Sequence, residues 1–193
     1  MSLSLFASIA IPLDICFLLS WYLTLPMLSK TTLKKLVEDG LIRDAPNIAL
    51  QLQPNGVELT LSSVERFTGV GRLAFDNSER INAPTESIPF DEDGWVYLPQ
   101  GAYVVRFNEV VSIPRGYGAL AKPRSSLLRS GATLHTAVWD AGYVGRGMSL
   151  LMVYNPHGFW LKRNARIVQL VLFVLDEGAD EVYRGEYLGE GVE

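Results

Sequence analysis

Short runs of alternating hydrophobic and polar residues dominate the chain from residue 48 onward. Residues 56–67 read GVELTLSSVERF, residues 102–107 read AYVVRF and residues 165–175 read ARIVQLVLFVL. Such runs, rich in β-branched and aromatic residues and bounded by turn residues, predict β-strands. The same signal predicts strands at residues 48–53, 94–98, 116–120, 133–139 and 149–155. Residues 76–87, DNSERINAPTES, have almost nothing to bury and predict a solvated loop. Many short strands favour a sandwich, jelly roll or closed barrel over a parallel α/β sheet.

A different pattern precedes the first predicted strand. Leu33, Leu36 and Val37 recur at helical spacing, which places them on one face and predicts a short amphipathic helix. Ser29 is a candidate N-cap, because serine hydroxyls accept hydrogen bonds from N–H groups at helix starts. Gly40 is a candidate end, because glycine adopts the left-handed conformation that closes many helices. The fold class expected is therefore mainly β with one short N-terminal helix.

Residues 1–26 form an apolar leader without lysine or arginine. A secretory signal would need a basic region before its apolar stretch and a small-residue cleavage site after it, and neither is clear. Against a membrane anchor, Asp14 falls mid-span, where a carboxylate costs about 2.5–3.5 kcal/mol on insertion scales. Three interpretations stay open: a start assigned upstream of a true first residue Met27, an anchor, or a folded or partner-bound segment. The first is favoured, which leaves one domain over residues 27–193.

Composition limits the classes of function. The single cysteine, Cys16, excludes a disulfide or a cysteine-based metal site within one chain and suits a reducing, cytoplasmic location. The net charge of −4 argues against broad binding to nucleic acid, which relies on lysine and arginine neutralising phosphates. Membrane association is not expected. A few local arginines can still bind a small anionic ligand.

One such location is residues 123–131, which read PRSSLLRSG. Ser125 is a candidate N-cap of a short helix, with Leu127 and Leu128 turned inward and Gly131 closing it. Free backbone N–H groups, serine hydroxyls and the guanidinium of Arg124 together suit a phosphate chain. An ordinary capped surface helix is the alternative interpretation of this segment.

A second location is residues 137–147, AVWDAGYVGRG, which predict a strand that runs into a tight glycine turn. Asp140 at the strand end is either a turn-forming residue or a carboxylate that activates water. Tyr143 offers an aromatic face three residues later, as binding of a sugar requires.

These segments, together with NGVELTL at residues 55–61 and RIVQL at residues 166–170, resemble successive motifs of the dUTPase and dCTP deaminase superfamily. The order and separations are similar to those of its archaeal dUTPase branch, and the similarity covers most of residues 27–193. The resemblance implies a jelly-roll-like β fold and a homotrimer with active sites between subunits. It also implies a magnesium ion (Mg2+) carried on the triphosphate of the substrate.

The resemblance further implies roles for single residues. Arg124, Ser125 and Ser126 would hold phosphate oxygens, and Gln169 of RIVQL would reach the same phosphates. Glu58 stands where most relatives have aspartate, at a position that touches magnesium through water. Compared with aspartate, glutamate has one more methylene group, which keeps the negative charge but changes its position.

The turn would supply the remaining contacts. By the same resemblance, Asp140 would orient the attacking water and the sugar 3′-hydroxyl, while Tyr143 would pack on the deoxyribose and exclude a 2′-hydroxyl. The backbone of residues 133–140 would distinguish uracil from cytosine through its donors and acceptors.

Met152 separates the two reactions of the superfamily. Deaminases that resemble this chain carry a catalytic glutamate three positions before the asparagine that ends the strand, and counting back from Asn155 places Met152 there. A thioether cannot exchange the proton that deamination needs. Hydrolysis of dUTP to dUMP and pyrophosphate is therefore the predicted function. A dCTP deaminase or bifunctional enzyme is the first alternative, and a nucleotide-binding regulator without catalysis is the second.

Overall fold

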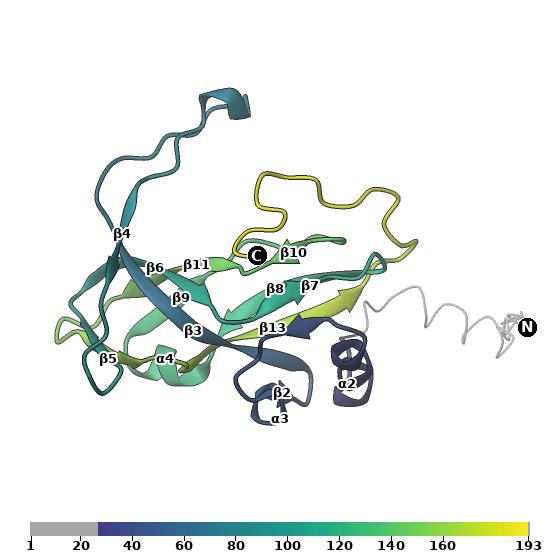
Figure 1. Ribbon diagram of the computed structural model, residues 1–193, viewed down its shortest axis with the longest axis horizontal. Helices are drawn as coiled ribbons and strands as arrows, with labels where there is room; N and C mark the ends of the chain where they lie inside the picture. Colours follow the sequence, from purple (N-terminus) through teal and green to yellow (C-terminus); the bar gives the residue numbers. More distant parts are fainter. Residues whose placement is uncertain (1–26, 193) are drawn as a thin grey trace, which may run out of the picture.

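The longest strand, β3 (Gly56–Phe67), crosses the whole molecule and pairs with four others (Figure 1). The computed structural model describes residues 27–192, so the predicted leader of residues 1–26 lies outside the described residues. The remaining elements are α2 (Lys30–Glu38), β1 (Ile42–Arg43), α3 (Ile48–Gln51), β2 (Leu52–Gln53), η1 (Asn77–Glu79), β4 (Thr85–Ile88), β5 (Trp95–Leu98), β6 (Gly101–Phe107), β7 (Val110–Ser112), β8 (Tyr117–Pro123), α4 (Ser125–Arg129), β9 (Ala132–His135), β10 (Val144–Gly145), β11 (Met148–Val153), β12 (Phe159–Lys162) and β13 (Arg166–Val174).

The main sheet has the order β8-β13-β3-β6-β11-β9, and its pairs are antiparallel. Its two ends approach each other, because Trp139 and Ala119 exchange two backbone hydrogen bonds of 2.9 Å. Thr136 adds a hydrogen bond from its hydroxyl to the carbonyl of Ala121 at 3.1 Å. The sheet therefore curls almost into a barrel, which reduces the number of unpaired strand edges.

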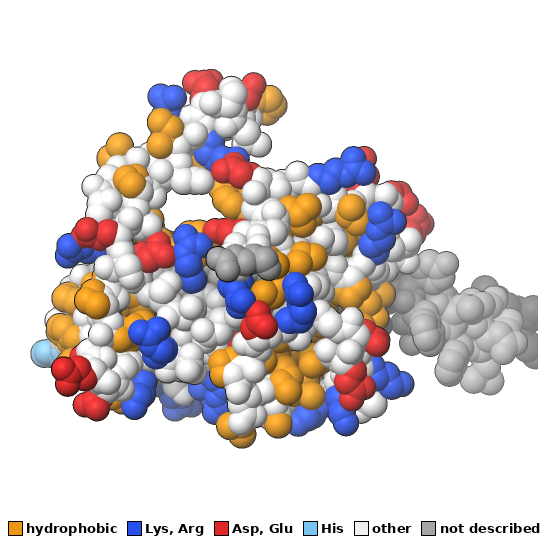
Figure 2. All heavy atoms as spheres, viewed as in Figure 1, with side chains coloured by type: hydrophobic (Ala, Val, Ile, Leu, Met, Phe, Trp, Pro, Cys, Tyr) orange, Lys and Arg blue, Asp and Glu red, His pale blue; other side chains and the backbone are white. Residues whose placement is uncertain are grey.

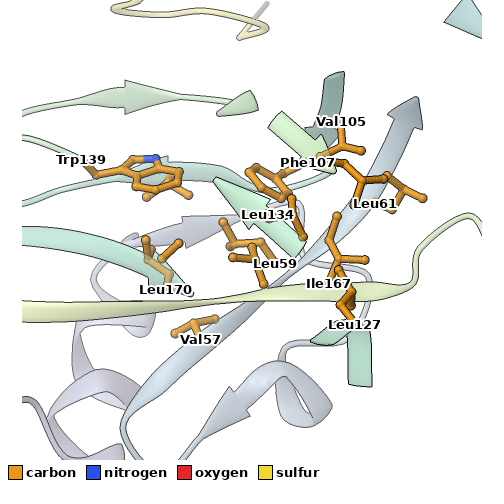
Figure 3. Close-up of a cluster of buried hydrophobic side chains, with 14 of the residues drawn as sticks. Val57, Leu59, Leu61, Val105, Phe107, Leu127, Leu134, Trp139, Ile167 and Leu170 are labelled. Atoms are coloured by element: carbon orange, nitrogen blue, oxygen red, sulfur yellow. The ribbon is translucent and has the colours of Figure 1, made fainter. Parts of the chain in front are cut away.

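The core fills the inside of this curl (Figure 3). Six consecutive residues of β3, Gly56 to Leu61, are buried, because the strand is paired on both sides and covered on both faces. Phe107 of the neighbouring strand β6, together with Leu134 and Trp139, packs into the same core cluster. This continuous apolar interior accounts for the stability of a chain without disulfides.

The mainly β prediction is confirmed, and β3 has the predicted bounds. Residues 48–51, however, form helix α3 instead of a strand. The side chain of Asn47 accepts a hydrogen bond from the backbone N–H of Leu50 at 3.2 Å and thereby caps this turn. Gln51 is buried and donates 2.8 and 2.7 Å hydrogen bonds to the Glu58 carbonyl and the Glu109 carboxylate. Local capping and one buried amide thus outweighed the alternating pattern.

The predicted N-terminal helix is present as α2, and Gly40 follows it with a φ of 97°. Ser29 occupies the N-cap position, but its hydroxyl makes no capping hydrogen bond and lies 3.4 Å from the Thr32 hydroxyl instead. None of the helices within residues 27–192 is long and apolar enough to cross a membrane.

Residues 68–84 form an arm that projects from the body between β3 and β4 (Figure 1). Only part of the predicted loop of residues 76–87 is irregular, since η1 lies within it and β4 begins at Thr85. Backbone hydrogen bonds between Arg72 and Ile81, of 2.9 and 3.0 Å, make the arm a hairpin. The arm contacts the C-terminal segment, residues 176–192, through an Arg80–Glu186 ion pair and a 3.2 Å hydrogen bond from Asn82 to Tyr187.

Candidate active site

Arg124, the first predicted phosphate-binding residue, lies where β8 ends and α4 begins. Its backbone N–H donates to the carbonyl of Ile167 on β13 at 3.1 Å. Its Nη1 donates to the carbonyl of Arg166 at 3.2 Å. Gln169 also lies on β13, where it pairs with Glu58 of β3 on one side and with Lys122 of β8 on the other. Strands β3, β13 and β8 therefore bring Glu58, Gln169 and Arg124 to one location.

Glu58 joins two arginines in this location, which we call the arginine cluster: Glu58, Arg124 and Arg166. The Glu58 carboxylate is nearly buried, with Oε1 lying 2.5 Å from Arg124 Nε and Oε2 lying 2.8 Å from Arg166 Nη1. Arg166 Nη1 also donates to the carbonyl of Leu50 at 3.0 Å. Two guanidinium groups and one carboxylate leave the arginine cluster with one net positive charge, which suits a phosphate.

Ser125 and Ser126 form the first turn of α4 and are exposed beside Arg124. The N-cap is Arg124 and not Ser125, and no side chain caps this helix. Leu127 is buried as predicted, whereas the inward position predicted for Leu128 is wrong, because that side chain is 56% exposed. In a helix of five residues only one side can face the core, so adjacent leucines diverge.

Asp140 lies in a second location, at a cavity of about 750 Å³ on the outer face of the sheet. The carboxylate is exposed, and the backbone turns here because the N–H of Tyr143 donates to the Asp140 carbonyl at 3.1 Å. His135, Trp139 and Arg106 also line the cavity, which opens between the arm and the C-terminal segment (Figure 2). Its volume is in the range that holds a nucleotide-sized ligand.

The C-terminal segment packs onto residues 140–143, which we call the Asp140 turn. The backbone N–H of Tyr183 donates to the Ala141 carbonyl at 2.8 Å, and the Tyr183 ring meets the Tyr143 ring edge-on at 5.6 Å. Gly142 has a φ of 80°, and a Cβ there would meet the Val182 side chain at 2.6 Å. Glycine is therefore required both by the turn and by the close approach of the segment.

Arg106 pairs with two carboxylates beside the cavity, lying 2.7 Å from Glu65 and 2.9 Å from Glu190 of the C-terminal segment. Burial acts to raise the pKa of Glu65, but hydrogen bonds from Thr85 and Arg106 and the positive charge of Arg106 outweigh it and lower that pKa. Burial, followed by the charges of Glu190 and Tyr183, raises the pKa of Tyr143 to about 12. The Tyr143 hydroxyl therefore stays protonated at neutral pH.

The structure divides the predicted site residues into two groups. Trp139 pairs with Ala119 near the start of β8, whereas Arg124 follows the end of β8. Five residues of extended strand span about 16 Å, so the Asp140 turn and the arginine cluster lie far apart within one chain. Arg124, Ser125, Ser126, Gln169 and Glu58 are absent from the residues that line the cavity around Asp140 and Tyr143.

Sequence reasoning missed two parts of this arrangement. Within the described residues, the C-terminal segment packs on the Asp140 turn of its own chain, which the sequence motifs do not indicate. The recurrence of tyrosine at positions 183 and 187 in an otherwise acidic tail was the available signal. The pairing of Arg166 with Glu58 was also missed, because the two residues are far apart in sequence.

Comparisons with known proteins show the family to which this chain is similar. A family model described as dCTP deaminase-like matches residues 27–175. The chain is 51% identical over 166 residues to the probable deoxyuridine 5′-triphosphate nucleotidohydrolase of Methanosarcina mazei, covering 85% of this chain and 97% of that protein. It is 46% identical over 168 residues to the protein of the same name from Archaeoglobus fulgidus, covering 86% of this chain and 98% of that protein.

Among solved structures, the fold is similar to that of a 2′-deoxycytidine 5′-triphosphate deaminase from Agrobacterium tumefaciens, with a TM-score of 0.58. The two sequences are 18% identical, and the match covers 77% of this chain and 48% of that chain. This chain therefore spans about half the length of the solved protein, and the likeness concerns the fold.

Proposed function

The chain belongs to the dCTP deaminase-like family, and from this premise we propose that it hydrolyses dUTP to dUMP and pyrophosphate. The resemblance read from the sequence motifs is confirmed by the family match and by the archaeal relatives. Those relatives bear the name of a dUTP nucleotidohydrolase and match this chain over almost their full length. A cytoplasmic location is part of the proposal.

The observation that carries the proposal is Asp140, an exposed carboxylate on a turn beside a nucleotide-sized cavity. We propose that Asp140 accepts the proton of a water molecule as that water attacks the α-phosphorus. The bond from this phosphorus to the bridging oxygen of the β-phosphate then breaks, and pyrophosphate leaves. A general base held at the reacting atom contributes typically 10²- to 10⁴-fold.

The proposed binding contacts come from both groups of residues. Arg124, Ser125 and Ser126 hold phosphate oxygens, with Gln169 on the adjacent strand. Tyr143, on the other side, packs against the deoxyribose, with the backbone of residues 133–140 reading uracil. Support for the phosphate side is its net positive charge and the exposure of both serine hydroxyls.

The separation of the two groups supports a shared site. About 16 Å of strand between them is too long for one α-phosphate to reach both Asp140 and Arg124 of the same chain. We therefore propose that the arginine cluster of one subunit meets the Asp140 turn of another, in a homotrimer. In a ring of identical subunits, each interface can form one such site.

Magnesium belongs to the proposal as a charge that enters with the triphosphate and neutralises it. Among residues 27–192 there is no group of three or more histidine, cysteine, aspartate or glutamate side chains that could hold a metal ion. The predicted water-mediated contact from Glu58 does not fit its surroundings, because each carboxylate oxygen already faces an arginine. No step above depends on a metal held by the protein.

Met152 favours hydrolysis over the alternative reaction. It lies on β11 between Thr133 of β9 and Ala102 of β6, and its thioether cannot transfer a proton. The alternative functions are a dCTP deaminase, with or without dUTP hydrolysis, and a nucleotide-binding regulator. Incubating the purified protein with magnesium and either dUTP or dCTP distinguishes the three candidate functions by their products. We expect dUMP and pyrophosphate from dUTP; ammonia from dCTP would support deamination, and binding without products would support the regulator.

A further inference from the structure

Glu58 occupies an unusual place for a residue at the edge of a phosphate site. It lies on the central strand β3, its side chain is only 5% exposed, and it faces Arg124 and Arg166, whose side chains are 29% and 35% exposed. A carboxylate removed from water in this way is costly unless it is paired. The two guanidinium groups supply that pairing and remain partly open to solvent.

We infer that Glu58 is a positioning residue that holds Arg124 and Arg166 as a pair, and that Arg166 is a second phosphate-binding guanidinium. This inference rests on the proposed function. It differs from a contact between Glu58 and magnesium, because both carboxylate oxygens point at arginine and not at the solvent.

Each arginine is fixed by more than Glu58. Arg124 Nη1 donates to the Arg166 carbonyl at 3.2 Å, and Arg166 Nη1 donates to the Leu50 carbonyl at 3.0 Å. Within residues 27–192, the Nη2 group of neither arginine has a hydrogen-bond partner. Each guanidinium is therefore anchored through its other donors, while its Nη2 group can donate to a ligand.

The planar, forked guanidinium of arginine allows some of its donors to be anchored while others bind a ligand. A guanidinium has five donors in one plane, so bonds on one side fix the direction of those on the other. Without the carboxylate, two like charges would stand side by side and repel each other. Glu58 thus sets both the distance between the arginines and the direction in which their free donors point.

The experiment measures binding of dUTP by calorimetry in EDTA, without metal, for the wild type and Glu58→Gln. Glutamine keeps the shape and removes the charge. If Glu58 holds the arginines, metal-free affinity falls about 10- to 100-fold, the scale of a lost charge-assisted hydrogen bond. If Glu58 acts only through magnesium, metal-free affinity is unchanged and only the magnesium concentration for half-maximal activity rises. That second result overturns the inference.

Three further variants guard against misfolding and non-specific charge effects. Glu86→Gln removes the same charge from an exposed ion pair with Arg66 and should bind dUTP like the wild type. Arg166→Gln leaves Glu58 paired with Arg124 and should weaken metal-free binding about 10-fold. Glu58→Asp, which restores the charge with a shorter reach, should recover part of the loss. If Arg166→Gln binds dUTP with wild-type affinity, Arg166 is not part of the phosphate-binding site.

Failure of the inference and failure of the proposed function give different results. A wild type that binds dUTP neither with nor without magnesium contradicts the proposed function. A wild type that binds and hydrolyses dUTP, alongside a Glu58→Gln variant of equal metal-free affinity, contradicts the inference alone.

Discussion

The arginine cluster and the Asp140 turn differ in what holds them in position. The cluster is set on three adjacent strands of the main sheet, with its carboxylate on the long central strand. The turn lies between β9 and the two-residue strand β10, and the C-terminal segment covers it. One half of the proposed site is thus built into the sheet, whereas the other depends on a segment at the far end of the chain.

In the proposed site, the arginine cluster would bind phosphates and the Asp140 turn would carry the catalytic carboxylate. Groups on a sheet are fixed when the core forms, which suits residues that must hold phosphates in a constant geometry. A turn covered by a short segment has a lower local stability and can adjust to a ligand or a second subunit. Substitutions in the two regions should therefore produce different changes in activity, assembly and stability.

The largest effect is expected from Asp140→Asn. Asparagine keeps the size of the side chain and cannot accept a proton from water, so dUTP hydrolysis should fall by about 10²- to 10⁴-fold. Binding of dUTP should persist, because the arginine cluster is unchanged. Steady-state kinetics measure the fall in dUTP hydrolysis, and calorimetry measures dUTP binding. A loss of binding as large as the loss of rate would show that the turn and the cluster are not separate in function.

A mixture of two inactive variants tests whether the halves come from different subunits. Asp140→Asn and Arg124→Ala, refolded together in equal amounts, should regain about a quarter of wild-type activity, because random assembly pairs intact halves at that frequency. Each variant refolded alone serves as the control. Absence of any recovery, in mixed oligomers confirmed by mass spectrometry, would place both halves of the site within one chain.

The sequence predicted secondary structure best where a single feature of the sequence determined the element. β3 was predicted with its bounds, because an alternating apolar run between turn residues has no strong competitor. The motifs also located Arg124 and Gln169 in elements of the expected type. Asp140 does not end the predicted strand of residues 133–139, because β9 stops at His135 and Trp139 forms only an isolated bridge. Residues 48–51 were mispredicted, because the cap by Asn47 and the burial of Gln51 outweighed the periodicity.

Pairings between distant residues could not be predicted from spacing. The bond between Glu58 and Arg166 depends on the register of β13 against β3, which a single sequence does not specify. Packing of Tyr183 on Tyr143 likewise depends on the path of the C-terminal segment. Short strands such as β7 and β10 gave no signal, because two or three residues are too few to show a period.

Tyr183→Ala tests the dependence of the Asp140 turn on the C-terminal segment. The substitution removes the edge-on contact with Tyr143, and such aromatic pairs contribute about 0.5–1.5 kcal/mol beyond the area they bury. The free energy of unfolding in urea should fall by at least that amount, and dUTP hydrolysis should fall more than metal-free dUTP binding. Tyr183→Phe keeps the ring and should behave like the wild type. An unchanged hydrolysis rate in Tyr183→Ala would show that the Asp140 turn keeps its conformation without the contact from the C-terminal segment.

The smallest effect is expected from the Glu65–Arg106 pair beside the cavity. The pKa of Glu65 is lowered from its ordinary value of 4.5 by hydrogen bonds and the charge of Arg106, which together outweigh burial. Its contribution to stability is therefore present above that ordinary value and is lost as the pH falls through the lowered pKa. Glu65→Gln should reduce the free energy of unfolding at pH 7 by about 1 kcal/mol, and the difference from the wild type should shrink as the pH falls through the lowered pKa of Glu65. Urea unfolding across this range measures it, with Glu86→Gln as the exposed control. A difference that stays constant with pH would mean that Glu65 stabilises the cavity by packing and not by charge.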